Sequence, residues 1–101
     1  MKKIIILNLL VFASCKTELK VSVKQAEISC GQCKFDLDSE DGCNLAVKFN
    51  EKAYFVDGFN IDDFGDAHDV NSGFCNVIRK GAIEGVIKDG RFIASAIELS
   101  K

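Results

Sequence analysis

The sequence contains no proline and no tryptophan, and it has a single histidine among its 101 residues. Without tryptophan, a hydrophobic core has to be built from phenylalanine, isoleucine, valine and leucine. One histidine and no paired nucleophile motif leave the chain without a hydrolase signature. The glycines form no GxGxxG phosphate loop, and the Asp-x-Asp-x-Asp-Gly order of a calcium loop is absent. These absences favour a binding protein over an enzyme.

Long apolar runs are also absent, apart from one near the start of the chain. Residues 4–12 are apolar except for Asn8, and they follow Lys2 and Lys3. About nine apolar residues are too short to span a hydrocarbon core of about 30 Å, so this run indicates a signal peptide at residues 1–14. We assign residues 15–24 to a tether and residues 25–101 to one small domain.

The end of this signal resembles a bacterial lipobox. The run Val11-Phe12-Ala13-Ser14-Cys15 places small residues before a cysteine, although Phe12 departs from the usual aliphatic residue. The resemblance implies that Cys15 carries the lipid and becomes the mature N-terminus. It also implies a cell-envelope protein, either on the outer membrane facing the periplasm or at the cell surface. The alternative is an ordinary secretory signal followed by an unrelated cysteine.

The chain has no excess of basic side chains. Removal of Lys2 and Lys3 with the signal leaves 11 basic and 15 acidic side chains, a net charge near −4. Nucleic-acid binding needs a basic footprint, so this class of partner is excluded. A second electrostatic attachment to anionic lipid is disfavoured for the same reason. We therefore expect membrane contact through the lipid anchor alone, and a small ligand or a protein as partner.

Four cysteines remain in the mature chain, and two of them form the motif Cys30-Gly31-Gln32-Cys33. An even number of cysteines outside the cytoplasm indicates two disulfides, for which three pairings exist. We favour Cys33 with Cys43 and Cys30 with Cys75. The alternatives are an extracytoplasmic thiol-redox protein using Cys30 and Cys33, or a metal site. The redox alternative is weakened by the acidic loop that follows the motif, because nearby carboxylates raise a thiol pKa.

A metal site would use Cys30 and Cys33 as one ligand pair, completed by Cys43, Cys75 or His68. Such a pair is the usual first half of a zinc site, and thiolates also suit reduced copper. A second candidate set lies in residues 53–78, which contain no lysine or arginine. Its members are the only imidazole and the neighbouring carboxylates: His68, Asp62, Asp63 and Asp66. A solvated acidic loop is the alternative interpretation of that stretch.

Period-two alternation of apolar residues predicts five strands. Two of them flank Asp89-Gly90, a strong hairpin signal, and the others cover residues 25–30, 45–49 and 53–56. Residues 62–68 are compatible with one helical turn, and residues 73–80 are predicted to form a short helix. The order predicts a mainly β protein, a small five-stranded OB-like Greek-key barrel with one short helix between strands three and four. The alternative is an open antiparallel sheet with a helix packed on it.

Several short motifs resemble a family of small bacterial lipoproteins of unknown function. They are the lipobox, the Cys-Gly-Gln-Cys motif at residues 30–33, a third cysteine at Cys43, and the runs at residues 54–58, 62–68 and 74–79. The resemblance covers most of the mature chain. It supports the domain boundaries and draws attention to the same cysteines and acidic residues, but it implies no activity.

The lipobox gives a first testable prediction. Replacement of Cys15 by alanine removes the only thiol that can accept the lipid, so Cys15→Ala should leave the membrane fraction or fail to mature. Detergent partitioning and the intact mass of the mature chain measure both effects. Unchanged partitioning together with an unchanged mature mass would contradict the assignment.

Overall fold

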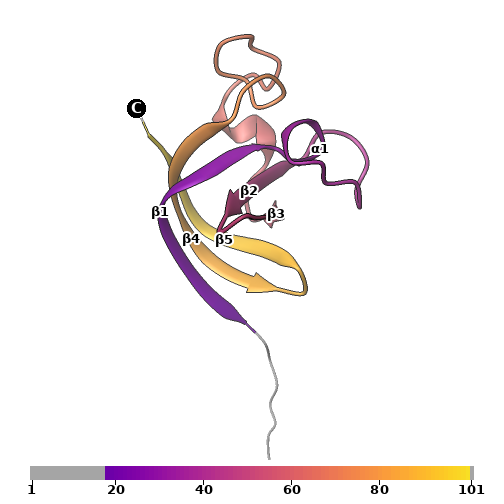
Figure 1. The fold of residues 1–101 in the computed structure, drawn as a ribbon. Helices are drawn as coiled ribbons and strands as arrows, with labels where there is room; N and C mark the ends of the chain where they lie inside the picture. Colours follow the sequence, from indigo (N-terminus) through magenta and orange to yellow (C-terminus); the bar gives the residue numbers. More distant parts are fainter. Residues whose placement is uncertain (1–17, 101) are drawn as a thin grey trace, which may run out of the picture.

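Residues 18–100 are described by a computed structural model, in which five strands close into a barrel (Figure 1). The strands are β1 (Leu19–Cys30), β2 (Leu45–Phe49), β3 (Lys52–Asp57), β4 (Arg79–Lys88) and β5 (Arg91–Leu99). Their order around the barrel is β1-β2-β3-β5-β4. The predicted five-stranded barrel is therefore confirmed, and the open-sheet alternative is wrong.

Two short helices accompany the strands. The helix α1 (Gly31–Lys34) directly follows β1, and the 3-10 helix η1 (Ile61–Phe64) follows β3. The helical element between the third and fourth strands is thus η1, which overlaps the turn expected at residues 62–68. Within residues 18–100, no helix is long and apolar enough to cross a membrane. The predicted signal peptide and Cys15 lie outside the described residues.

All neighbouring strands pair antiparallel except β3 and β5. This parallel contact is short and joins Val56 to Phe92 and Asp57 to Ile93. It is nevertheless the contact that closes the barrel, because it links the β1-β2-β3 side to the β4-β5 hairpin.

The first strand is longer than the sequence pattern indicated. It begins at Leu19, whereas the predicted strand begins at residue 25, so the second half of the expected tether belongs to the barrel. A register shift between Val23 and Ala26 bends β1. Before the bend β1 pairs only with β4, and near its end it pairs with both β2 and β4. The bend lets β1 pair with β4 along one edge and with β2 along the other.

The hairpin between β4 and β5 has the predicted turn. Asp89 and Gly90 both have positive φ, at 55° and 78°, as a type I′ turn requires. Further along the hairpin, the register shifts between Glu84 and Gly85. A Cβ atom on Gly85 would collide with the carbonyl oxygen of Ile93, so only glycine permits this close approach of β4 and β5.

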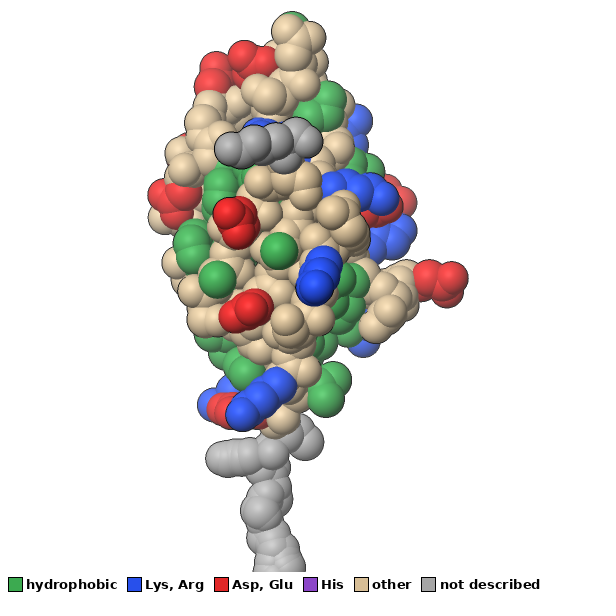
Figure 2. Space-filling model, turned by 90° about the vertical axis from the view of Figure 1, so that its left-hand side faces the viewer, with side chains coloured by type: hydrophobic (Ala, Val, Ile, Leu, Met, Phe, Trp, Pro, Cys, Tyr) green, Lys and Arg blue, Asp and Glu red, His purple; other side chains and the backbone are tan. Residues whose placement is uncertain are grey.

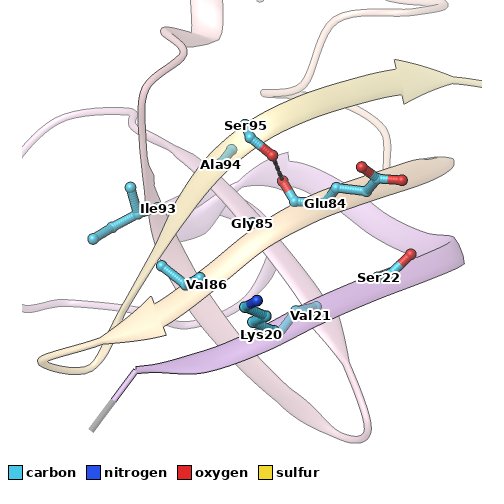
Figure 3. Close-up of a pocket in the computed structure, with 9 residues that line it drawn as sticks. All are labelled: Lys20, Val21, Ser22, Glu84, Gly85, Val86, Ile93, Ala94 and Ser95. Carbon is cyan, nitrogen blue, oxygen red and sulfur yellow. Dashed lines mark hydrogen bonds between the residues drawn. The ribbon is translucent and has the colours of Figure 1, made fainter. Parts of the chain in front are cut away.

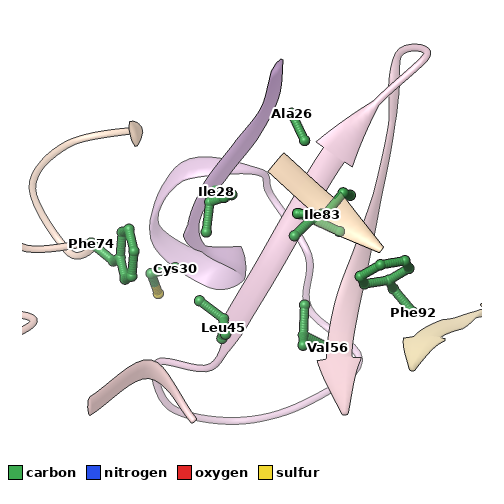
Figure 4. Close-up of a cluster of buried hydrophobic side chains, with 9 residues drawn as sticks. Ala26, Ile28, Cys30, Leu45, Val56, Phe74, Ile83 and Phe92 are labelled. Carbon is green, nitrogen blue, oxygen red and sulfur yellow. The ribbon is translucent and has the colours of Figure 1, made fainter. Parts of the chain in front are cut away.

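The core fills the barrel with side chains from every strand (Figure 4). Phe92 is completely buried, near Ile83 and Val56 in the close-up, while Phe74 lies beside Cys30. Truncation of a buried phenylalanine to alanine typically costs about 3–5 kcal/mol. The remaining core positions are aliphatic: Ala26, Ile28, Leu45 and Val47.

The prediction of a helix at residues 73–80 is wrong. This segment contains turns, and β4 begins at Arg79. Its backbone makes one isolated turn, with the amides of Asn76 and Val77 both donating to the carbonyl of Gly73. The carbonyls of Phe74 and Val77 face the hydroxyl of Ser29 on β1 instead of a following helical turn. Tertiary hydrogen bonds have overridden the local helical pattern.

The Ser29 hydroxyl is completely buried and lies 2.7 Å from the carbonyl oxygens of both Phe74 and Val77. Ser29→Ala removes this donor from the Val77 carbonyl, whereas the Phe74 carbonyl still accepts from the Cys30 amide at 3.2 Å. A buried acceptor without a donor costs about 1–3 kcal/mol. We therefore expect the free energy of unfolding in urea to fall by about that amount.

Ser95→Ala is the matched control. Ser95 is exposed and also donates to a backbone carbonyl, that of Glu84 at 3.1 Å. Exposed substitutions of this kind usually change the free energy of unfolding by less than about 0.5 kcal/mol. We call the contact between Ser29 on β1 and the carbonyls of residues 74–77 the seam. Equal decreases in the free energy of unfolding of the two variants would show that the seam makes no special contribution to stability.

Candidate metal centre

Four cysteines from separate parts of the chain converge at one end of the barrel. The Sγ atoms of Cys30, Cys33, Cys43 and Cys75 all lie within 4.8 Å of one another, and all four are free thiols. Cys30 ends β1, Cys33 lies in α1, Cys43 precedes β2, and Cys75 lies in the turns before β4. Among residues 18–100 this is the one grouping of histidine, cysteine and carboxylate side chains suited to a metal ion.

The chain turns from β1 into α1 between Cys30 and Cys33, and this turn sets the positions of the two sulfurs. The single helical turn lets the Cys33 amide donate to the Cys30 sulfur at 3.3 Å. Gly31 is buried in this turn, and its amide donates to the carbonyl of Asn44 at 2.8 Å. A Cβ atom on Gly31 would lie 2.7 Å from the ring of Phe55. The glycine between the cysteines therefore allows the turn to pack directly on the barrel.

The loop that carries Cys43 is held by Gln32. The side-chain amide of Gln32 donates to the carbonyl of Glu40 at 3.0 Å and accepts from the amide of Asn44 at 2.9 Å. These two bonds fix the loop on both sides of Cys43. As a result, the Cys43 sulfur lies 2.6 Å from that of Cys30 and 4.0 Å from that of Cys33.

A second fixation point of the same loop is Arg91 at the start of β5. Its guanidinium group bonds to both carboxylate oxygens of Asp57, at 2.9 and 2.8 Å, and also to the carboxylate of Glu40. The hydrogen bonds to Asp57 and then to Glu40 raise the pKa of Arg91 above its ordinary value. Glu40 is thus held through its side chain by β5 and through its carbonyl by α1.

Cys75 reaches the cluster from the opposite side. Its amide donates to the carbonyl of Ala67 at 3.0 Å. A side chain on Gly73 would collide with the same carbonyl group, so a glycine is needed where the two segments touch. The side chain of Asn76 adds bonds to the carbonyls of His68 and Asp69. The sulfur of Cys75 then lies 2.9 Å from that of Cys43, although the two residues are 32 positions apart.

The pKa values of Cys30, Cys33 and Cys43 are shifted in different directions. Burial raises the pKa of Cys30, but hydrogen bonds from Cys43 and Cys33 outweigh it, and the net effect is a lowered pKa. Its hydrogen bond with Cys30, followed by burial, raises the pKa of Cys33 to about 11. Burial and then the bonds to Cys30 and Cys75 raise the pKa of Cys43 far above its ordinary value. Of these three thiols, Cys30 therefore releases its proton most readily.

These properties weigh against disulfide exchange as the main activity. A reactive thiol needs both a lowered pKa and access to its substrate. Here Cys30, with the lowered pKa, is completely buried, whereas the exposed Cys33 has a raised pKa. The helix that follows is only four residues long. The motif therefore lacks the arrangement that activates a thiol-redox pair.

The second predicted set does not join the thiol cluster. His68 is exposed, and its ring lies 3.8 Å from the carboxylate of Asp66, which is exposed as well. Asp62 and Asp63 lie in η1, where Asp63 caps the backbone amide of Asn60 at 2.7 Å. The structure therefore offers no convergence of His68, Asp62, Asp63 and Asp66 on one point. It also gives Gln32 and Asn44 positioning roles for which the sequence contains no recognisable signal.

The described residues form further hollows, of which two are relevant to ligand binding. One, of about 460 Å³, borders Cys43 and is lined by Asp57, Asp62, Asp63 and Arg91 among others. The other, of about 620 Å³, lies over β1, β4 and β5 around Gly85 (Figure 3). Acidic and basic side chains are scattered over the face shown in Figure 2, without a continuous basic patch there. Neither hollow brings together a set of ligands comparable to the four thiols.

Comparison with known proteins gives one match. No curated protein and no solved structure matches the chain. A family model matches residues 24–100, which include all four clustered cysteines and every strand except the first part of β1. The chain therefore belongs to a family of unknown function (DUF6370).

Proposed function

We propose that this protein binds one thiophilic metal ion through Cys30, Cys33, Cys43 and Cys75, and that the ion is Zn²⁺. The observation that carries the proposal is the approach of all four sulfur atoms to within 4.8 Å of one another. Two disulfides would require only that each sulfur lie close to one other sulfur, not that all four lie together. A four-way convergence from three segments, residues 30–33, Cys43 and Cys75, is typical of tetrahedral sites with four sulfur ligands, which bind zinc or iron.

The dimensions of the cluster suit a single ion. Zinc–sulfur bonds of about 2.3 Å give a tetrahedron with sulfur–sulfur edges of about 3.8 Å. The separation of 4.0 Å between the sulfurs of Cys33 and Cys43 is close to that edge. The separations from Cys43 to Cys30 and Cys75 are shorter, at 2.6 and 2.9 Å. Zinc loading would therefore move the Cys43 sulfur outward by about 1 Å, which a ligand on a loop can accommodate.

Four protein ligands leave no coordination position for a substrate. Closed sites of this kind stabilise a fold or hold an ion, whereas catalytic zinc sites keep one position open. This supports a binding protein rather than an enzyme. Reduced copper is the second candidate ion, because soft thiolates favour it as well.

The proposed setting is the cell envelope, with the barrel anchored through Cys15. The support is the predicted signal at residues 1–14 and the lipobox-like run that ends at Cys15. Because β1 begins at Leu19, four positions after Cys15, three residues lie between the lipid-bearing position and the barrel. An extended chain of that length spans at most about 14 Å. An anchored barrel would therefore lie close to the lipid headgroups.

Zinc titration of a reduced chain that starts at Lys16, and so keeps every described element, tests the metal site. We expect one zinc ion per chain in native mass spectrometry. Because Cys33, with a pKa of about 11, and Cys43 hold their protons at neutral pH, zinc has to displace at least those two. Affinity measured against a chromophoric chelator should therefore rise steeply from pH 6 to pH 8. Substoichiometric zinc, or affinity independent of pH, would contradict the proposal.

Two variants separate the thiol site from the acidic loop. Cys75→Ser removes a ligand and should weaken zinc binding by more than about 100-fold, since even residues behind the ligands contribute 10–100-fold. His68→Ala should leave zinc affinity unchanged, because His68 lies outside the cluster. A large loss in His68→Ala with little loss in Cys75→Ser would move the site to the acidic loop.

Gln32 should act as a positioning residue for the ligand Cys43. Gln32→Ala breaks the bonds to Glu40 and Asn44 and should lower zinc affinity by about 10–100-fold. Gln25→Ala is the matched control, because Gln25 is an exposed glutamine on β1. The chelator competition assay and a urea unfolding curve should be measured on both variants. Equal zinc affinities in the two would exclude a positioning role for Gln32.

A further inference from the structure

We propose that a peroxide oxidises this site in a fixed order, joining Cys33 to Cys43 first and thereby ejecting the cation. The inference rests on the proposed metal site and adds a regulation to it. It follows from the unequal exposure of the four sulfurs and from the different hydrogen bonding of the segments that carry them.

The oxidant can reach Cys33 most easily. Cys33 is exposed, Cys43 and Cys75 are half-buried, and Cys30 has no exposed surface. A metal-bound thiolate remains nucleophilic, so access decides which of the four reacts first. The exposed position of Cys33 on α1 therefore makes it the entry point for a small oxidant such as hydrogen peroxide.

The second sulfur is selected by the segment that carries it. Cys43 lies 4.0 Å from Cys33 and belongs to the irregular loop before β2. The amides of Cys30 and Cys75 themselves donate to the carbonyls of Phe74 and Ala67, whereas the bonds from Gln32 hold Glu40 and Asn44 on either side of Cys43. A disulfide needs sulfurs about 2.05 Å apart, so one partner has to move by about 2 Å. Cys43 can make that movement with the least disturbance of the barrel.

The chemistry consumes one peroxide for each disulfide. The Cys33 thiolate attacks one oxygen of hydrogen peroxide, the O–O bond breaks, and a sulfenic acid forms as hydroxide leaves. The Cys43 thiolate then attacks the Cys33 sulfur, the S–S bond forms, and the S–O bond breaks with loss of a second hydroxide. Two thiolates have lost two electrons in total, and the peroxide has accepted both. Buffer protonates the two hydroxides to water.

The cation is then left with two of its four ligands. Cys30 and Cys75 remain as thiolates, and two sulfurs bind zinc far more weakly than four. Their sulfurs lie within 4.8 Å of each other, so a second peroxide can join them as well. The same four cysteines would therefore hold a cation when reduced and form two disulfides when oxidised. This explains how a metal site and the pairings Cys33–Cys43 and Cys30–Cys75 can belong to one protein.

The experiment starts from the zinc-loaded chain that begins at Lys16, treated with less than one equivalent of hydrogen peroxide. Samples quenched with an alkylating reagent are mapped by mass spectrometry without reduction, while a chromophoric chelator records released zinc. We expect Cys33–Cys43 to be the first crosslink and to appear together with about one zinc per peroxide consumed. A first crosslink that contains Cys30 or Cys75, or zinc that stays bound after crosslinking, would overturn the proposal.

Two metal-free variants provide the matched comparison, because each lacks one ligand; they are compared with the metal-free parent at pH 10, where part of Cys33 is ionised because its pKa is about 11. In Cys33→Ser, the rate of crosslink formation by peroxide should fall at least tenfold. In Cys75→Ser, the Cys33–Cys43 crosslink should form at nearly the parental rate. Similar slowing in both variants would refute Cys33 as the entry point. If the parent bound no zinc, the proposed function would fail, while the crosslink order in the metal-free chain would still decide the order of oxidation.

Discussion

The seam between the end of β1 and the turn at Phe74 is the contact on which the rest of the site depends. The Ser29 hydroxyl and the Cys30 amide both lie within hydrogen-bond distance of the Phe74 carbonyl, at 2.7 and 3.2 Å. Ser29 and Phe74 are 45 positions apart, so these bonds join the beginning and the later part of the barrel. They also bring Cys75 to Cys30. Without this seam the thiol cluster would lose one of its four members.

Electrostatics explains why such a cluster favours a bound cation. Burial raises the pKa of Cys30, and the hydrogen bonds from the Cys43 thiol and the Cys33 amide lower it by more. The nearby guanidinium of Arg91 is engaged by Asp57 and Glu40. A divalent ion is the species that can compensate several thiolates at once. A ligand that binds only the folded state also stabilises it, so the barrel and the site should support each other.

The barrel could be predicted from the sequence more completely than the site. The strands and the Asp89-Gly90 hairpin follow from local alternation and turn chemistry, which act over a few residues. The helix expected at residues 73–80 failed because the carbonyls of Phe74 and Val77 face a hydroxyl on a distant strand. The early start of β1 was missed for a similar reason. Its first half is defined by pairing with β4, which no local pattern reports.

The same distinction separates the candidate ligands. The spacing of Cys30 and Cys33 indicates a ligand pair directly, because one turn places both sulfurs together. The contributions of Cys43 and Cys75 depend on the barrel closing and on Gln32 holding a loop, and neither is visible in the sequence. His68 was a candidate ligand only because it is the single imidazole of the sequence. In the structure it is exposed beside Asp66.

The four thiols lie in the part of the chain that matches the family. Residues 24–100, which match the family, contain all four thiols, the seam at Ser29 and the Gln32 contacts. The predicted signal and Cys15 precede the matched region. The proposed anchoring and the proposed metal binding therefore depend on separate parts of the chain. The thiol cluster lies in the part that matches the family, while the proposed lipid attachment would determine only where that cluster is placed.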